Sequence, residues 1–343
     1  MTALKTRTPK SGPLARLAGA VALGSLLLGA PAASAADNVK LALNWLVSGK
    51  NAPYFVAVEK GFYAEQGLNV SISRGNGSGD TIKRVAAGES DFGLADTAAV
   101  IGAKANDESP VKLVGLIFGK SSVAILYVKG AIKEPNDLIG KKLGRSAAGA
   151  SVNMFPAFLQ ANKIERSGIN EVVVNPNSFL PLMLSKQVDA VLDQSSYLGR
   201  YRKGAQEAGL DIDAFRFADY GLDLYGDGII VKTDLIKSNP ALIKRFMAAT
   251  LKGSQYAFEN PDEAIAILRK TNPEIDADVG KEELLDTKQL AMTDEVAKHG
   301  LGYIDAKHME NVRDIVTKSL SLKRSVPVDE IYTLEFLPPE KKS

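Results

Sequence analysis

Two stretches of the chain follow one pattern: Ala86-Ala87-Gly88-Glu89-Ser90-Asp91-Phe92-Gly93-Leu94-Ala95-Asp96 and Leu184-Ser185-Lys186-Gln187-Val188-Asp189-Ala190-Val191-Leu192-Asp193-Gln194. Each stretch contains the end of a helix, a three-residue connection, an aspartate, a short apolar strand and a polar loop. Residues 41–55 and 143–155 match each other in the same way, as a strand, a glycine-bearing loop and a helix. These repeats predict an α/β protein built from two similar lobes.

The rest of the chain divides around this repeat. Apolar segments at 123–129 and 228–232 read as strands that link the lobes, and residues 239–319 read as mostly helical. We therefore predict a first lobe from residues 36–122 and 228–343, and a second lobe from residues 123–227. Because open α/β sheets bind ligands at the carboxyl ends of their strands, two facing lobes predict a ligand cleft between them.

Residues 1–35 have the pattern of a cleaved secretory signal peptide. Four basic residues without an acidic one precede an apolar stretch at 17–30, and Ala33-Ser34-Ala35 forms a small-x-small cleavage site. This pattern predicts export to the periplasm with cleavage near Ala35. The chain without this segment has 38 basic and 40 acidic residues, because the leader holds 4 of the 42 basic ones. That balance argues against nucleic acid or an anionic membrane as a partner.

Composition also argues against many classes of enzyme. The chain has no cysteine and two histidines, His299 and His308, which both lie in the helical tail and are expected at the surface or as caps. No nucleophile elbow or zinc-protease motif is present. We therefore predict a protein that is not an enzyme and that needs no cofactor or metal. One catalytic alternative stays open, in which Asp96 and Asp193 act as an acid–base pair.

Candidate ligand contacts come from loops that follow predicted strands, together with one loop near the return strand. They are Asn44, Trp45, Ser78, Gly79, Asp96, Asp193, Tyr197 and Tyr225. Trp45 either stacks on a flat ligand or anchors the core. Ser78 and neighbouring amides either hold a ligand oxygen or belong to a tight turn, with Asp80 capping a helix at 81–87.

Several segments then resemble a known family. They are Leu43-Asn44-Trp45, Ala52-Pro53-Tyr54-Phe55-Val56-Ala57, Glu59-Lys60-Gly61-Phe62-Tyr63, Gln66-Gly67-Leu68, Gly77-Ser78-Gly79-Asp80-Thr81, Asp91-Phe92-Gly93 and Glu335-Phe336-Leu337-Pro338. Over essentially the whole chain after the leader, the sequence resembles the periplasmic solute-binding proteins for thiamine-pyrimidine precursors, taurine, alkanesulfonates and nitrate.

The resemblance implies a two-lobed, type II periplasmic-binding-protein fold with the ligand cleft between the lobes. It also implies delivery of a small-molecule solute to an ABC permease with its ATPase, and a cleft lined by Asn44, Trp45, Ser78, Gly79, Asp96, Asp193 and Tyr225. Yeast relatives that make the thiamine pyrimidine use a cysteine-rich motif and a histidine. Since this chain has no cysteine, the resemblance does not extend to that synthase activity.

Two classes of solute fit the candidate residues. Trp45, Tyr197 and Tyr225 with Asp96 and Asp193 suit an aromatic or heterocyclic solute that carries amino groups, such as a pyrimidine precursor. Ser78, the amides at 77–79, Ser146, Arg145 and Lys120 suit an organic anion: taurine, an alkanesulfonate or an aromatic carboxylate. Nitrate and bicarbonate are less suitable solutes, because such small ions would contact little of the surface of an aromatic cleft. We expect a solute of the heterocyclic class. We also expect the protein to be a monomer, since both lobes must face a permease.

Overall fold

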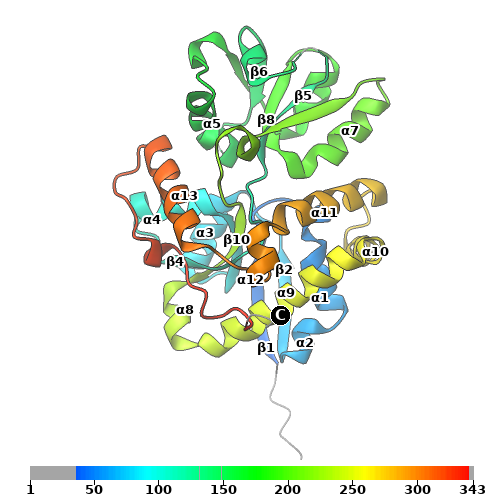
Figure 1. Ribbon diagram of the computed structural model, residues 1–343. Helices are drawn as coiled ribbons and strands as arrows, with labels where there is room; N and C mark the ends of the chain where they lie inside the picture. Colours follow the sequence, from blue (N-terminus) through cyan, green and yellow to red (C-terminus); the bar gives the residue numbers. More distant parts are fainter. Residues whose placement is uncertain (1–35, 131, 148, 340–343) are drawn as a thin grey trace, which may run out of the picture. The chain divides into compact units, whose positions relative to one another are not determined.

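The structure is a computed structural model that describes residues 36–130, 132–147 and 149–339. The predicted signal peptide, residues 1–35, lies outside the described residues. Within the described ranges the strands form two five-stranded sheets, each covered by helices (Figure 1). The predicted α/β class with two sheets is confirmed.

The first sheet combines early strands with one from much later in the chain. Its order is β2 (Leu68–Ser73), β1 (Asp37–Ala42), β3 (Phe92–Asp96), β10 (Asp227–Lys232) and β4 (Val111–Leu116). Strand β1 is parallel to β2 and β3, whereas β10 runs antiparallel to both of its neighbours. The return strand is therefore an internal member of the sheet and not only a linker.

The second sheet repeats this arrangement strand for strand. Its order is β7 (Asn170–Val173), β6 (Lys142–Arg145), β8 (Ala190–Gln194), β5 (Val123–Val128) and β9 (Ile212–Arg216). Strand β6 is parallel to β7 and β8, and β5 is antiparallel to β8 and β9. The sequence pattern did not predict β9; it predicted β5 as a strand that links the lobes, but not its place inside the sheet.

Asp91 and Asp189, which are aligned in the repeat, form equivalent hydrogen bonds in the two sheets. The Asp91 carboxylate accepts a hydrogen bond from the Lys40 backbone N–H at 2.8 Å, and Asp189 accepts one from the Lys142 N–H at 2.8 Å. Each bond fixes the start of one strand against the neighbouring strand. The match between the two stretches is therefore structural, and neither aspartate belongs to the cleft.

The helices fall into three groups along the chain. The first group is α1 (Ala52–Glu59), α2 (Phe62–Glu65), α3 (Ser78–Ala87) and α4 (Thr97–Asp107). The second is α5 (Ala150–Ala161), α6 (Phe179–Leu184) and α7 (Leu198–Gln206). The third is α8 (Thr233–Ser238), α9 (Pro240–Glu259), α10 (Pro261–Thr271), α11 (Ala277–Ala291), α12 (Asp294–His299), α13 (Ala306–Ser319) and α14 (Val328–Ile331).

The C-terminal helices pack mainly on first-sheet elements, as the sequence predicts. Helix α9 packs on α1, and α13 lies beside α4, where Figure 1 shows orange-red next to cyan. Two of these helices also reach the second sheet's helices, because α11 contacts α7 and α13 contacts α5. The tail therefore connects both halves of the molecule.

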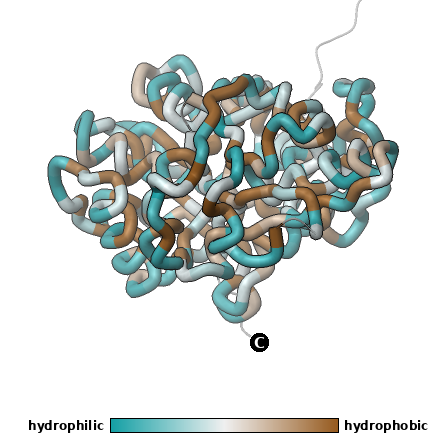
Figure 2. Tube along the Cα trace, turned by 90° about the horizontal axis from the view of Figure 1, so that it is seen from above, coloured by the Kyte–Doolittle hydropathy of each residue, from teal (hydrophilic) through white to brown (hydrophobic). Residues whose placement is uncertain are grey.

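One buried apolar cluster joins the two sheets. It contains Leu113 of β4, Leu143 of β6, Phe155 of α5 and Met309 of α13, all fully buried. Figure 2 shows short hydrophobic stretches alternating with hydrophilic ones along the whole trace, as amphipathic elements require. Among the described residues, no helix combines the length and the apolar character needed to cross a membrane.

Helix α3 begins earlier than the sequence predicts. It starts at Ser78 rather than at Thr81, so Asp80 lies in the first turn and is not the cap. The residue before the helix is Gly77, whose φ of +119° is a conformation that residues with a side chain rarely adopt. This glycine lets the chain turn directly from the loop into the helix, and it brings Ser78 into the cleft wall.

Candidate ligand-binding cleft

A cavity of about 1170 Å³ is lined by elements of both sheets. The first-sheet side consists of residues 44–46, the loop and first turns at 76–83, the end of β3 and one face of α4. The second-sheet side comes from α5, α6, the end of β8 and the start of α7. The carboxyl ends of parallel strands from both sheets thus meet one cleft, as predicted for facing α/β lobes.

The loop after β1 places Asn44 and Trp45 in the cleft wall. The N–H of Gly77 donates to the Asn44 carbonyl at 2.7 Å, and the N–H of Gly75 donates to the Trp45 carbonyl at 3.2 Å. Asn44 is 4% exposed, and among the described residues its Oδ1 has no hydrogen-bond partner. Trp45 is half-buried and packs against the second sheet's apolar cluster, so it both lines the cleft and anchors the packing.

Ser78, Gly79 and Asp96 also line the cleft. The Asp96 N–H donates to Ser78 Oγ at 3.0 Å, which joins the start of α3 to the end of β3. Asp96 Oδ1 accepts the N–H of Ala98 at 3.0 Å and that of Ala99 at 3.3 Å, so this carboxylate caps α4. Burial, with the nearby Asp227 carboxylate, raises the pKa of Asp96 to about 7.

Asp193 and Tyr197 lie on the opposite wall of the cleft. The Tyr201 hydroxyl donates to Asp193 Oδ2 at 2.6 Å, while burial of the Asp193 carboxyl raises its pKa. The Tyr197 side chain is buried, and the Lys50 ammonium lies 5.4 Å from the centre of its ring. Arg200 lies over the Tyr197 ring, with its guanidinium carbon 4.4 Å from the ring centre.

Tyr225 lies outside this cleft, although the sequence placed it among the ligand contacts. It is 1% exposed, its hydroxyl donates to Glu295 Oε2 at 2.7 Å, and the same oxygen accepts the Asp305 N–H at 3.0 Å. Its ring centre lies 4.0 Å from that of His308. A position near the return strand could not distinguish a place in the cleft from this packing site beside Glu295 and His308.

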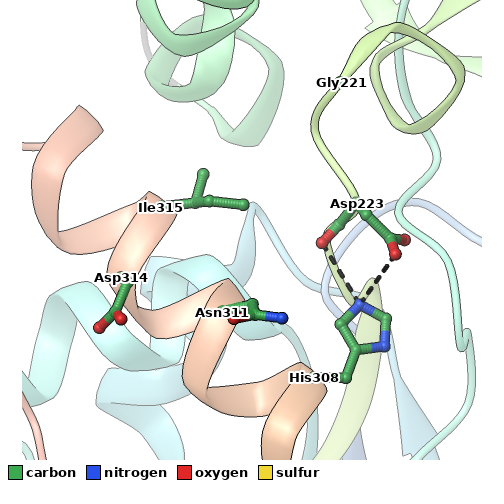
Figure 3. A pocket seen from close by; sticks show the side chains of 6 residues that line it. All are labelled: Gly221, Asp223, His308, Asn311, Asp314 and Ile315. Atoms are coloured by element: carbon green, nitrogen blue, oxygen red, sulfur yellow. Dashed lines mark hydrogen bonds and ion pairs between the residues drawn. The ribbon is translucent and has the colours of Figure 1, made fainter.

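His308 also differs from its predicted surface or capping role. Its backbone N–H joins the cap of α13 by donating to Asp305 Oδ1, but its imidazole bonds to Glu295 and lies 3.4 Å from Asp223 Oδ2. Figure 3 shows the ring pointing at Asp223 beside a smaller hollow of about 360 Å³. The described residues contain no group of three or more metal-ligating side chains.

The sequence analysis did not identify two buried charged residues behind the cleft floor, Lys50 and Asp227. Lys50 is 1% exposed, and its ammonium lies 3.4 Å from Gln194 Oε1 and 3.8 Å from Asp227 Oδ2. Asp227 is directly opposite Asp96 in the β10–β3 ladder. The only local signals were the glycine before Lys50 and the position of Asp227 before the return strand.

The charges that line the cleft are mainly acidic. The described lining residues include four acids, Asp80, Asp96, Asp107 and Asp193, against two bases, Lys83 and Arg200. Lys120 and Arg145, which the sequence suggested as partners of an anion, do not belong to the lining. Arg145 instead forms an ion pair with Glu171 at 2.6 Å.

A family model described as NMT1/THI5 like matches residues 49–264 of the chain. The chain belongs to the NMT1/THI5-like family. Relatives of this NMT1/THI5-like protein include the riboflavin-binding protein RibY of Chloroflexus aurantiacus, which is 26% identical over 323 residues, 90% of each chain. The formylaminopyrimidine-binding protein of Halalkalibacterium halodurans is 24% identical over 68% of this chain and 70% of its own.

Other relatives of this NMT1/THI5-like chain are named as enzymes. A 4-amino-5-hydroxymethyl-2-methylpyrimidine phosphate synthase of Legionella pneumophila is 25% identical over 70% of this chain and 75% of its own.

Among solved structures, the aliphatic sulphonate binding protein SsuA from Escherichia coli matches with a TM-score of 0.67 and 15% identity. That match covers 89% of this chain and 95% of the other, and it confirms the periplasmic-binding-protein fold.

Proposed function

We propose that this protein captures a flat aromatic or heterocyclic solute in the periplasm and delivers it, as a monomer, to an ABC permease with its ATPase. The observation that carries this proposal is the combination of Trp45 and Tyr197 with a mainly acidic cleft lining. Aromatic faces favour flat rings, and carboxylates accept hydrogen bonds from amino or ring N–H groups. The Oδ1 of Asn44, which has no hydrogen-bond partner within the described part of the chain, is a further acceptor for such a donor.

The names of two relatives support the same class of solute. Riboflavin and formylaminopyrimidine, which those proteins are named for binding, are both flat nitrogen heterocycles. The described lining has four acids against two bases, and so it offers no excess of positive charge to balance a sulfonate or carboxylate.

Binding without chemistry is the second part of the proposal. Some relatives are named as synthases, but this chain has no cysteine to supply the cysteine-rich motif that the resemblance implies for the yeast synthases. Neither histidine belongs to the described lining of the cleft. We therefore infer that the solute leaves the protein unchanged, and mass spectrometry of recovered solute tests this directly.

We also propose that the lobes are residues 36–122 with 228–343, and residues 123–227. The two sheets support this division, since strands β5 to β9 all lie between residues 123 and 216. The chain crosses between the sheets twice, after β4 and before β10, and two crossings suit a hinge that closes on a solute.

A thermal-shift screen tests the class of solute. The panel contains aminopyrimidines, riboflavin, aromatic carboxylates, taurine, alkanesulfonates and nitrate. A solute that binds only the folded protein raises the melting temperature with the logarithm of its concentration over its Kd. We expect shifts from heterocycles, reduced when Asp96 is replaced by Asn. Shifts confined to sulfonates or carboxylates would overturn the heterocyclic class.

A further inference from the structure

Helix α11 packs closely against a segment from each wall of the cleft, through its backbone at Gly49 and through the Glu282 side chain at Gly199. A Cβ atom placed on Gly49, in the loop that follows Trp45, would lie 2.0 Å from the Gly280 carbonyl oxygen. A Cβ atom placed on Gly199, in the first turn of α7, would lie 2.5 Å from Glu282 Oε2. Gly49 thus permits a backbone approach that a larger residue would disturb, whereas a larger residue at Gly199 would require the Glu282 side chain to shift.

Glu283 of α11 connects these two segments chemically. Its side chain is 3% exposed, and each carboxylate oxygen has one partner. Oε2 accepts the Gly49 backbone N–H at 2.8 Å, and Oε1 accepts Arg200 Nη2 at 3.3 Å. Gly49 belongs to the loop that carries Trp45 and Lys50, whereas Arg200 covers the ring of Tyr197. Glu283 does not itself line the cleft.

Resting on the proposed function above, we propose that Glu283 is a positioning residue that sets solute affinity by holding both aromatic walls of the cleft. Through Gly49 it fixes the loop that presents Trp45, and through Arg200 it fixes Tyr197. A buried carboxylate with both oxygens occupied by charged or backbone donors is stable only while those donors stay in place. The geometry of the two walls is therefore set by one side chain that the solute does not touch.

The fluorescence of Trp45 tests this without any solute, because Trp45 is the one tryptophan of the chain. Acrylamide quenching reports how accessible its ring is. Glu283→Gln keeps an acceptor for the Gly49 N–H but loses the charge that pairs with Arg200, whereas Glu283→Ala loses both. We expect quenching to increase from wild type to Glu283→Gln to Glu283→Ala, with Arg200→Met resembling Glu283→Gln.

The matched control is Lys203→Met. Lys203 of α7 forms another ion pair with the α11 region, to Asp276 at 2.5 Å, but both partners are about half-exposed and neither touches Glu283 or Arg200. Lys203→Met is expected to leave Trp45 quenching unchanged. Circular dichroism checks that every variant is folded, and Glu283→Gln with Arg200→Met carries the test if Glu283→Ala does not fold.

Affinity is the second measurement, made with whichever heterocycle of the panel shifts the melting temperature. We expect about tenfold weaker binding for Glu283→Gln and Arg200→Met, since each loses a charge-assisted contact in a buried site. Quenching and affinity of the Glu283 variants equal to those of Lys203→Met would overturn the positioning role. If no solute of the panel binds wild type, the proposed function fails, whereas the quenching order still decides the role of Glu283.

Discussion

Asp96 combines two roles that make opposite demands on its charge. As the N-cap of α4 it accepts two backbone N–H groups, which favours the ionised carboxylate. Burial beside the Asp227 carboxylate favours the neutral acid and outweighs the cap, so the pKa of Asp96 is raised to about 7. Lys50, 3.8 Å from Asp227, also acts to lower the pKa of Asp96, but this effect is smaller than that of burial and of the Asp227 carboxylate.

This conflict predicts how stability depends on pH. The folded protein holds the Asp96 proton up to about pH 7, whereas the unfolded chain releases it near the ordinary pKa of 3.8. The contribution of Asp96 to the free energy of unfolding therefore falls as the pH rises from 3.8 to about 7, by up to about 4 kcal/mol. Asp96→Asn keeps a capping acceptor and has no proton to lose.

Urea unfolding at pH 4.5 and 7.5 checks this expectation. We expect the free energy of unfolding to fall less between these two pH values in Asp96→Asn than in wild type. An equal fall in both proteins would show that Asp96 is ionised in the folded state throughout the range.

At the residue scale, the sequence predicted those cleft residues whose position depends on their own strand. Asn44, Trp45, Ser78, Gly79, Asp96, Asp193 and Tyr197 all line the cleft, because each follows or faces a strand end. Whether they bind solute stays a prediction. Glu283 was missed because its contact with Gly49 joins residues 234 positions apart, and Tyr225 was misplaced because it packs on Glu295.

At the element scale, the repeat predicted most strands and helices, since aspartate, apolar run and polar loop are local features. The pattern did not reveal which strands are neighbours. The segments at 123–129 and 228–232 were predicted as strands that link the lobes, but their places inside the two sheets, as β5 and β10, were not predicted. Strand pairing depends on residues distant in the sequence, so a short apolar run has the same appearance at the edge and in the centre of a sheet.

The close packing of the Trp45 loop on α11 gives an element-scale prediction. Gly49→Ala places a methyl group where the Gly280 carbonyl oxygen lies, so the loop or the helix must move. We expect a loss of about 1 to 3 kcal/mol in the free energy of unfolding, as for other overpacked sites. Gly79→Ala is the control, because nothing lies within 4 Å of a Cβ atom there. Equal urea midpoints for the two variants would contradict the prediction.

At the scale of the whole molecule, the two sheets share one core. The cluster that includes Leu113, Leu143 and Met309 draws on both sheets and on α13, so separating the lobes would expose apolar surface of each. We therefore expect one cooperative unfolding transition. Trp45 fluorescence and far-ultraviolet circular dichroism, followed together in urea, are expected to give superimposable curves. Two separate midpoints would show lobes that unfold independently.

The place of β10 between β3 and β4 has a consequence for how the chain is made. A ribosome releases every strand of the second sheet, the last of which ends at Arg216, before it releases Asp227–Lys232. Until then β4 has no neighbour in its own sheet, because β10 is the strand that joins it to β3. The sheet whose first strands are translated earliest is thus the sheet that is completed last.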